Sequence, residues 1–259
     1  MQDVFFITRK SPRAPCSRHR RQTSGQQPFP RCRLRVDDRL HRARPGHGKS
    51  DIDLVLIHRQ LPAARRESLR EQGWPVEAFI HDLHTLQYFF DHVDRPSGVP
   101  SLASMVNDGR LLCGDEALAA QAKAMAQAAL RRGPPPWDAA ARDASRYALT
   151  DIVDDIRAPF PDFALRAALA QLLPLLANHY LRGRGLWSAK GKAIARRLAQ
   201  VDPGYAARFD AAFQLAFHSG ETAPLIQLAA DTLQADGGWL FQSYQLTTPA
   251  DWRCEPVYG

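Results

Sequence analysis

The sequence predicts an α+β protein in which a small domain with a mixed sheet precedes an α-helical bundle domain. Two apolar runs, Ile52–Ile57 and Trp74–His81, are short and rich in β-branched or aromatic residues, as buried strands are. Residues 133–136 (GPPP) interrupt the chain, because consecutive prolines cannot continue a helix. Beyond this break, leucine and alanine recur at three- and four-residue spacing, which is typical of packed helices. We therefore expect a mixed-sheet domain over residues 49–132 and a helical domain over residues 137–259.

Further elements are expected between and after these two strands. In the first domain, the polar residues 63–72 predict a helix that ends at Gly73. Residues 115–132 predict the clearest helix, because they are rich in alanine, begin with acids and end with two arginines. Shorter helices are expected at residues 84–93 and 99–109, with a short strand at 111–113. In the second domain, helices are expected at residues 137–157, 162–181, 188–200, 203–219 and 221–235.

The net charge of +7 on 259 residues is concentrated in one segment. Residues 1–48 contain 12 Lys or Arg and three acids, which leaves 22 basic and 24 acidic residues, a charge of −2, for the rest. Nucleic-acid binding is therefore not favoured for the body of the chain. The segment itself admits three interpretations: a disordered basic tail, an electrostatic arm for nucleic acid or an acidic partner, or an aberrant stretch read outside the native frame.

Several classes of protein are disfavoured by what the sequence lacks. No apolar run approaches the roughly 20 residues that span a bilayer, and the first residues lack the pattern of a secretory signal, so a cytoplasmic protein is expected. The four cysteines form no CxxC pair, which argues against a zinc site. No Walker loop, GxGxxG motif or Ser-His-Asp arrangement is visible. His179, within an apolar helix, is expected to be a core histidine.

The main chemical signal is a pair of acids at the start of the first strand, Asp51 and Asp53. Side chains alternate along a strand, so these two project from the same face, about 7 Å apart. Paired carboxylates at the mouth of a buried strand repel each other unless a cation compensates them. Because Mg²⁺ prefers carboxylate oxygens and nucleotide phosphates, the pair predicts a metal site for phosphoryl transfer. The alternative is a strand end whose acids face water.

A third acid, Glu77, lies in the middle of the second apolar strand. An acid at such a position is expensive to bury without a partner. If the two strands are neighbours, Glu77 completes a three-carboxylate cluster, in which it could bind metal or act as general base on an acceptor hydroxyl. The alternative is an edge strand with Glu77 exposed.

The segment SDIDLVLI (residues 50–57), followed by a strand with a third acid, resembles the polymerase-β-like nucleotidyltransferase superfamily. The downstream GRLLCGD (residues 109–115) and the helical half look like the two-domain aminoglycoside and lincosamide nucleotidyltransferases. The resemblance covers about residues 50–240. It implies that Asp51 and Asp53 bind Mg²⁺ and that Glu77 is the third ligand or base. It also implies transfer of a nucleoside monophosphate, AMP from ATP, to a hydroxyl of a small molecule such as an aminoglycoside, an antibiotic-resistance activity.

The resemblance also implies nucleotide contacts outside the acidic cluster. Ser50 directly precedes the aspartate pair, and Lys190 and Lys192 precede a basic helix in the second domain. In two-domain members such cations bind the triphosphate, and ammonium groups pair well with phosphate. The alternative for the two lysines is a solvated helix start. An acidic site for a polycationic acceptor is expected between the domains.

One element of the family pattern is absent from this sequence. A Gly-Ser pair about ten residues before the aspartates would hold the nucleotide phosphates, but residues 41–50 (HRARPGHGKS) contain none. A shifted reading frame through Arg39-Leu40-His41 would restore such a pair if those codons are GC-rich. Its absence leaves a second functional class open: a non-catalytic protein of the same fold, either a nucleotide binder or a toxin–antitoxin-type partner.

Overall fold

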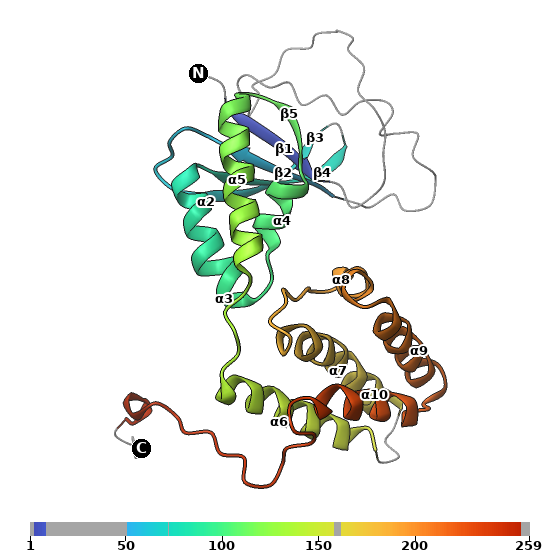
Figure 1. Ribbon diagram of the computed structural model, residues 1–259. Coiled ribbons are helices and arrows are strands. Elements are labelled where there is room, and N and C mark those ends of the chain that lie inside the picture. The colour runs from blue at the N-terminus through green and yellow to red at the C-terminus, as the bar shows by residue number, and fades with distance from the viewer. Residues whose placement is uncertain (1–2, 9–50, 72, 158–161, 255–259) are drawn as a thin grey trace, which may run out of the picture. The chain divides into compact units, whose positions relative to one another are not determined.

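The structure, a computed structural model, describes residues 3–8, 51–71, 73–157 and 162–254 (Figure 1). The chain divides into two compact units, Met1–Pro134 and Pro135–Gly259. The first contains a five-stranded mixed sheet with helices, and the second is helical. The fold class is therefore α+β, with a small mixed-sheet unit followed by an α-helical unit, as the sequence predicts.

The sheet has the strand order β3-β4-β2-β1-β5. Strands β2 and β4 are parallel, and every other neighbouring pair is antiparallel. All six residues of β2 are buried, which is why a run that is apolar except at Asp53 marks this strand in the sequence. The strands are β1 (Val4–Thr8), β2 (Ile52–Ile57), β3 (Arg65–Glu71), β4 (Trp74–His81) and β5 (Arg110–Cys113).

Two expectations about the first unit are wrong. Residues 63–72 do not form a helix, because Arg65–Glu71 is strand β3 and pairs antiparallel with β4. Gly73 forms the turn between the two strands with a φ of +84°, a conformation that favours glycine. Strand β1 lies in the segment for which no element was expected, and it pairs with both β2 and β5. Residues 9–48 of that segment lie outside the described part of the chain.

The helices of the first unit cover one face of the sheet (Figure 1). Val55 and Ile57 of β2 and Phe6 of β1 pack on that face against Leu86 and Val106 of the helices. Asp53, two residues before Val55 in β2, lies on this same face. The helical segments are α2 (Leu83–Phe89), a π-helical turn (Phe90–Asp94), α3 (Arg95–Ser97), α4 (Ser101–Asp108) and α5 (Glu116–Arg132).

Buried and capping aspartates fix where these helices begin. Asp82 forms a capping box with Thr85 at the start of α2, and Asp115 caps α5. Asp94 accepts a hydrogen bond of 2.9 Å from the backbone N–H of Ala103 in α4. Burial raises the pKa of Asp94 to about 6, although backbone N–H groups of α4 favour its charged form. Carboxylates in this unit therefore serve structure as well as the candidate site.

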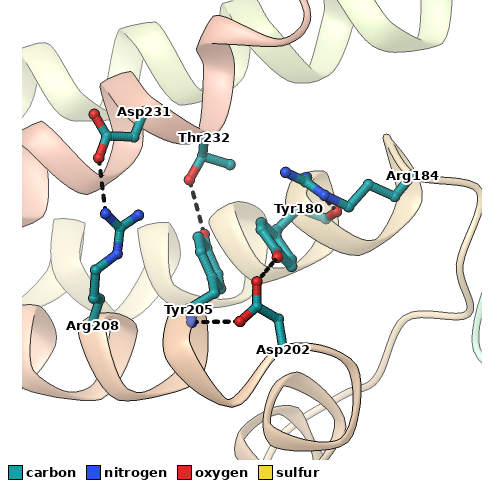
Figure 2. Close-up of a pocket in the computed structure, with 7 residues that line it drawn as sticks. All are labelled: Tyr180, Arg184, Asp202, Tyr205, Arg208, Asp231 and Thr232. Atoms are coloured by element: carbon teal, nitrogen blue, oxygen red, sulfur yellow. Dashed lines mark hydrogen bonds and ion pairs between the residues drawn. The ribbon is translucent and has the colours of Figure 1, made fainter.

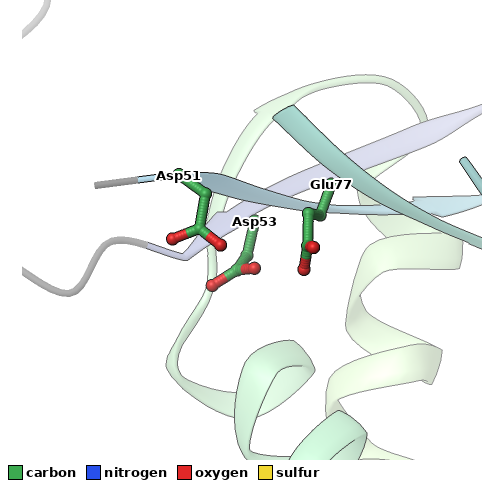
Figure 3. A group of neighbouring side chains, drawn as sticks. All are labelled: Asp51, Asp53 and Glu77. Carbon is green, nitrogen blue, oxygen red and sulfur yellow. The ribbon is translucent and has the colours of Figure 1, made fainter. Parts of the chain in front are cut away.

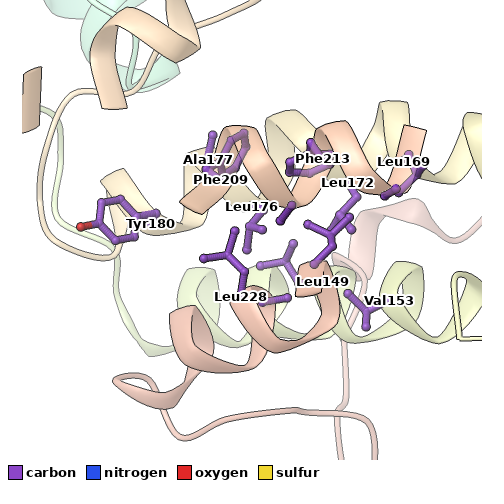
Figure 4. Close-up of a cluster of buried hydrophobic side chains, with 14 of the residues drawn as sticks. Leu149, Val153, Leu169, Leu172, Leu176, Ala177, Tyr180, Phe209, Phe213 and Leu228 are labelled. Carbon is purple, nitrogen blue, oxygen red and sulfur yellow. The ribbon is translucent and has the colours of Figure 1, made fainter. Parts of the chain in front are cut away.

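The second unit is a bundle of five helices among the described residues. Its core contains Leu149 of α6, Leu172 and Leu176 of α7, Phe213 of α9 and Leu228 of α10 (Figure 4). The helices are α6 (Ala139–Asp155), α7 (Asp162–Arg182), α8 (Ala193–Val201), α9 (Pro203–Ser219) and α10 (Ala223–Gln234). The helical periodicity of the sequence is thus confirmed.

Helix α8 begins five residues later than expected. Gly191 has a φ of +52°, and Lys192 is the N-cap of the helix, so residues 188–192 lie before it. Pro174 lies inside α7, where it leaves one backbone carbonyl without its helical partner. None of the helices in the described part of the chain is both long and apolar enough to cross a membrane.

Candidate metal centre

The local structure of β2 places Asp51 and Asp53 at one end of the strand, on one face. Asp51 directly precedes the strand and is partly buried, whereas Asp53 is its second residue and is only 7% exposed. Because side chains alternate, Asp53 shares the helix-covered face with Val55 and Ile57. Two carboxylates thus lie next to the apolar side chains that pack between the sheet and the helices.

The parallel pairing of β2 with β4 brings the third acid to the same place. Asp53 lies directly opposite Glu77 in the register of the two strands. One carboxylate oxygen from each of Asp51, Asp53 and Glu77 lies within 4.8 Å of the other two. Figure 3 shows the three carboxyl groups on the same side of the sheet. The structure therefore brings together all three acids that the sequence singles out.

The chemistry of this cluster suits a hard divalent cation. Three carboxylates this close repel one another, and a cation that binds them offsets this repulsion. Carboxylate oxygens are the ligands that Mg²⁺ prefers. Asp51 and Glu77 are partly exposed, so solvent and ions can reach the cluster. The donor set fits Mg²⁺, and the role of these residues as its ligands stays a prediction.

An arginine on the neighbouring strand contacts this cluster. Arg66 of β3 lies opposite Phe79 of β4, and its Nη2 donates to Glu77 Oε2 at 2.7 Å. Its guanidinium also lies over the Phe79 ring, 5.0 Å from the ring centroid. Sequence reasoning missed Arg66 because it assigned this segment to a helix. The signal that could have found it is Gly73, which lies between two segments of strand length.

The other residues expected to bind the nucleotide are not placed at this cluster. Ser50 lies outside the described residues. Lys190 and Lys192 are exposed and lie just before and at the N-cap of α8, in the second unit. The acids belong to the first unit. A shared site of the lysines and the acids therefore stays a prediction.

Comparison with known proteins gives a weak structural likeness. No protein-family model matches the chain, and no curated protein matches it. Among solved structures, the chain is similar to a nucleotidyltransferase-like protein from Exiguobacterium sibiricum, with 16% sequence identity and a TM-score of 0.35. The match covers 71% of this chain and 60% of that one, so this chain spans less than two thirds of its length.

His179 of α7 is a fully buried core histidine, and it is satisfied by two partners. Its Nδ1 lies 2.9 Å from Ser145 Oγ, and its Nε2 lies 3.0 Å from Asp236 Oδ2. No motif marks this Ser-His-Asp arrangement, because its members lie 34 and 57 residues apart in the chain. Arg142 also donates to Asp236 Oδ1, at 2.6 Å. We interpret this network as structural, since it ties α6 and α7 to the residues after α10.

A small polar pocket of about 220 Å³ lies among α7, α9 and α10 (Figure 2). Asp202 caps α9 and accepts a hydrogen bond from the Tyr180 hydroxyl at 2.7 Å. Tyr205 stacks on Tyr180 and is hydrogen-bonded to Thr232. The polar groups that line this pocket thus bind one another and hold the helices together. The remaining lining residues are Arg184, Arg208 and Asp231.

Proposed function

We propose that this chain is a metal-dependent nucleotidyltransferase. It transfers a nucleoside monophosphate, AMP from ATP, to a hydroxyl of a small molecule such as an aminoglycoside. The observation that carries the proposal is the convergence of Asp51, Asp53 and Glu77, whose oxygens lie within 4.8 Å of one another. The resemblance of residues 50–57 to polymerase-β-like nucleotidyltransferases supplies the reaction class.

Each acid has a role in the proposed reaction. Asp51 and Asp53 hold Mg²⁺, which when bound neutralises negative charge on the phosphates. Glu77 is the third ligand or accepts the proton of the acceptor hydroxyl. The hydroxyl oxygen forms a bond to the α-phosphorus, the bond from that phosphorus to the α,β-bridging oxygen breaks, and pyrophosphate leaves. The Arg66 guanidinium donates to Glu77 Oε2, which leaves Oε1 and the second lone pair of Oε2 for either role.

Replacement of Glu77 by glutamine is the direct test of this reaction. We expect transfer of labelled AMP from ATP to an aminoglycoside panel to fall at least about a hundredfold, because an amide cannot accept the proton. Mn²⁺ affinity separates the two roles of Glu77: it falls only modestly, through the lost charge, if Glu77 is only the base, and it falls much further if Glu77 is a ligand. Glu67→Gln is the matched control, since Glu67 is on the opposite face and pairs with Arg65.

The missing Gly-Ser pair keeps one alternative, a non-catalytic protein of this fold, either a nucleotide binder or a toxin–antitoxin-type partner. The same assay distinguishes the two functions. Tight ATP binding by the native protein, without transfer to any acceptor of the panel, would support the nucleotide-binder alternative and refute the enzyme.

Lys190 and Lys192 are proposed to bind the triphosphate. Both are exposed at the start of α8, where an ammonium group is free to meet an anion. We expect the double variant Lys190→Ala/Lys192→Ala to raise the Kd for Mg²⁺–ATP about tenfold or more, because charge-assisted bonds to phosphate are lost. Equilibrium binding measures this Kd. An unchanged Kd would assign the two lysines to a solvated helix start.

A further inference from the structure

We propose that Arg66 is a nucleotide-binding residue, whose guanidinium contacts a phosphate group of the nucleotide held at the acidic cluster. This inference rests on the proposed function and adds to it a cation from the same unit as the acids. Neither the sequence pattern nor the resemblance points to this residue.

The guanidinium of Arg66 is held in a fixed position. The antiparallel register of β3 and β4 puts Arg66 opposite Phe79, and Glu77 lies two residues earlier on the same face of β4. The guanidinium contacts both of these residues, one through the ring at 5.0 Å and the other through the 2.7 Å ion pair. Two contacts on one rigid strand hold a long side chain that is otherwise costly to order.

The donor capacity of this side chain suits a phosphate ligand. A guanidinium carries five N–H groups in a planar fork, which matches the oxygens of a phosphate. In the described part of the chain, Arg66 uses Nη2 for Glu77. Its side chain is 57% exposed, so the other donors are accessible to a ligand. The ion pair therefore positions the guanidinium and leaves its remaining N–H donors for a ligand.

The net charge of the acidic cluster also favours a role for Arg66. One divalent ion leaves a single negative charge on the three carboxylates, and this residual charge would repel a nucleotide phosphate. Arg66 is a cation that pairs with Glu77, and it offsets part of this charge at the cluster's edge. A phosphate that approaches the metal and Glu77 therefore meets a guanidinium rather than an uncompensated acid.

Arg65 provides a matched control on the same strand. It lies opposite Ile80, on the other face of the sheet, and its Nε contacts Glu67 at 2.6 Å. It has the same side chain and a similar exposure, 51% against 57%. Only its position relative to the acidic cluster differs.

The test is the Kd of the full chain for the Mg²⁺ complex of α,β-methylene-ATP, a non-transferable analogue, measured by calorimetry. We expect Arg66→Ala to raise this Kd about ten- to a hundredfold, Arg66→Lys to raise it less, and Arg65→Ala to leave it within about twofold. Binding of Mn²⁺ alone is expected to persist in Arg66→Ala.

The outcomes separate this inference from the proposed function. If Arg66→Ala and Arg65→Ala bind the analogue equally well, while Asp53→Asn does not bind it, Arg66 has no such role and the proposed function stands. Loss of Mn²⁺ binding in Arg66→Ala would also overturn the inference, because Arg66 would then act by shaping the metal site. Failure of the native protein to bind the analogue would overturn the proposed function and this role together.

Discussion

Replacement of Asp53 by asparagine is expected to abolish both nucleotide transfer and the stabilisation of the protein by divalent cations. Asp53 is the middle member of the cluster, because it lies directly opposite Glu77 in the sheet and two residues after Asp51 on the same face. An amide removes one of three negative charges and is a poorer ligand for Mg²⁺. A cation that binds only the folded state, at a hundred times its Kd, adds about 2.7 kcal/mol to the free energy of unfolding. Asp53→Asn should lose this increment.

The measurement is thermal unfolding of the native chain and the variant, in Mg²⁺ or Mn²⁺ and in EDTA. The native protein should melt higher with the cation, and Asp53→Asn should melt at the same temperature in both conditions. Glu67→Gln, on the opposite face of the sheet, should respond like the native protein. A variant at Asp53 that keeps the full cation-dependent shift would show that these carboxylates are not a metal site.

The cluster could be anticipated from the sequence because it depends on local patterns. The strands Ile52–Ile57 and Trp74–His81 have the bounds that their apolar residues predict. Alternation of side chains then fixes which residues share a face. The cluster also requires that these two strands be neighbours in the sheet, which local patterns do not specify. Their parallel pairing meets this requirement.

Other parts of the first unit could not be anticipated in this way. Strand β3 (Arg65–Glu71) is mostly charged and lies at an edge of the sheet, so no apolar alternation marks it. Charged residues protect such an edge from pairing with other chains. Because of these charged residues, the sequence of an edge strand can look like that of a polar helix. Arg66 was missed as a consequence. Strand β1 has only five residues, and it becomes a strand through pairing with β2 and β5.

In the second unit, helix positions follow from the sequence but the polar contacts between helices do not. Helix α9 has the predicted bounds, Pro203–Ser219, because Asp202 and Gly220 mark its ends. The partners of His179 lie 34 and 57 residues away from it. Such pairs depend on helix packing, which periodicity alone does not specify.

Replacement of Asp236 by alanine is expected to lower the free energy of unfolding of the helical unit by about 3 kcal/mol. The Asp236 side chain is 12% exposed and binds both His179 and Arg142. Removal of one partner of a buried ionic network costs about 3–5 kcal/mol, because the remaining groups stay desolvated. Arg142 is 33% exposed and can regain water, which places the estimate at the low end. Urea unfolding of the full chain, followed by helical circular dichroism, measures the loss.

Asp231→Ala is the control. Asp231 pairs with Arg208 on the surface, so its replacement should lower the free energy of unfolding by less than about 1 kcal/mol.

The pH dependence of the free energy of unfolding is a second measurement of the same network. Burial lowers the pKa of His179 below its ordinary value of 6.5, and Asp236 partly opposes this shift. The unfolded chain therefore binds a proton near pH 6.5 that the folded chain does not, so the native free energy of unfolding falls as the pH drops below 6.5. Without Asp236 the imidazolium is disfavoured further, and this fall should extend to lower pH. Equal stability and equal pH dependence of Asp236→Ala and Asp231→Ala would show that the network contributes nothing beyond a surface ion pair.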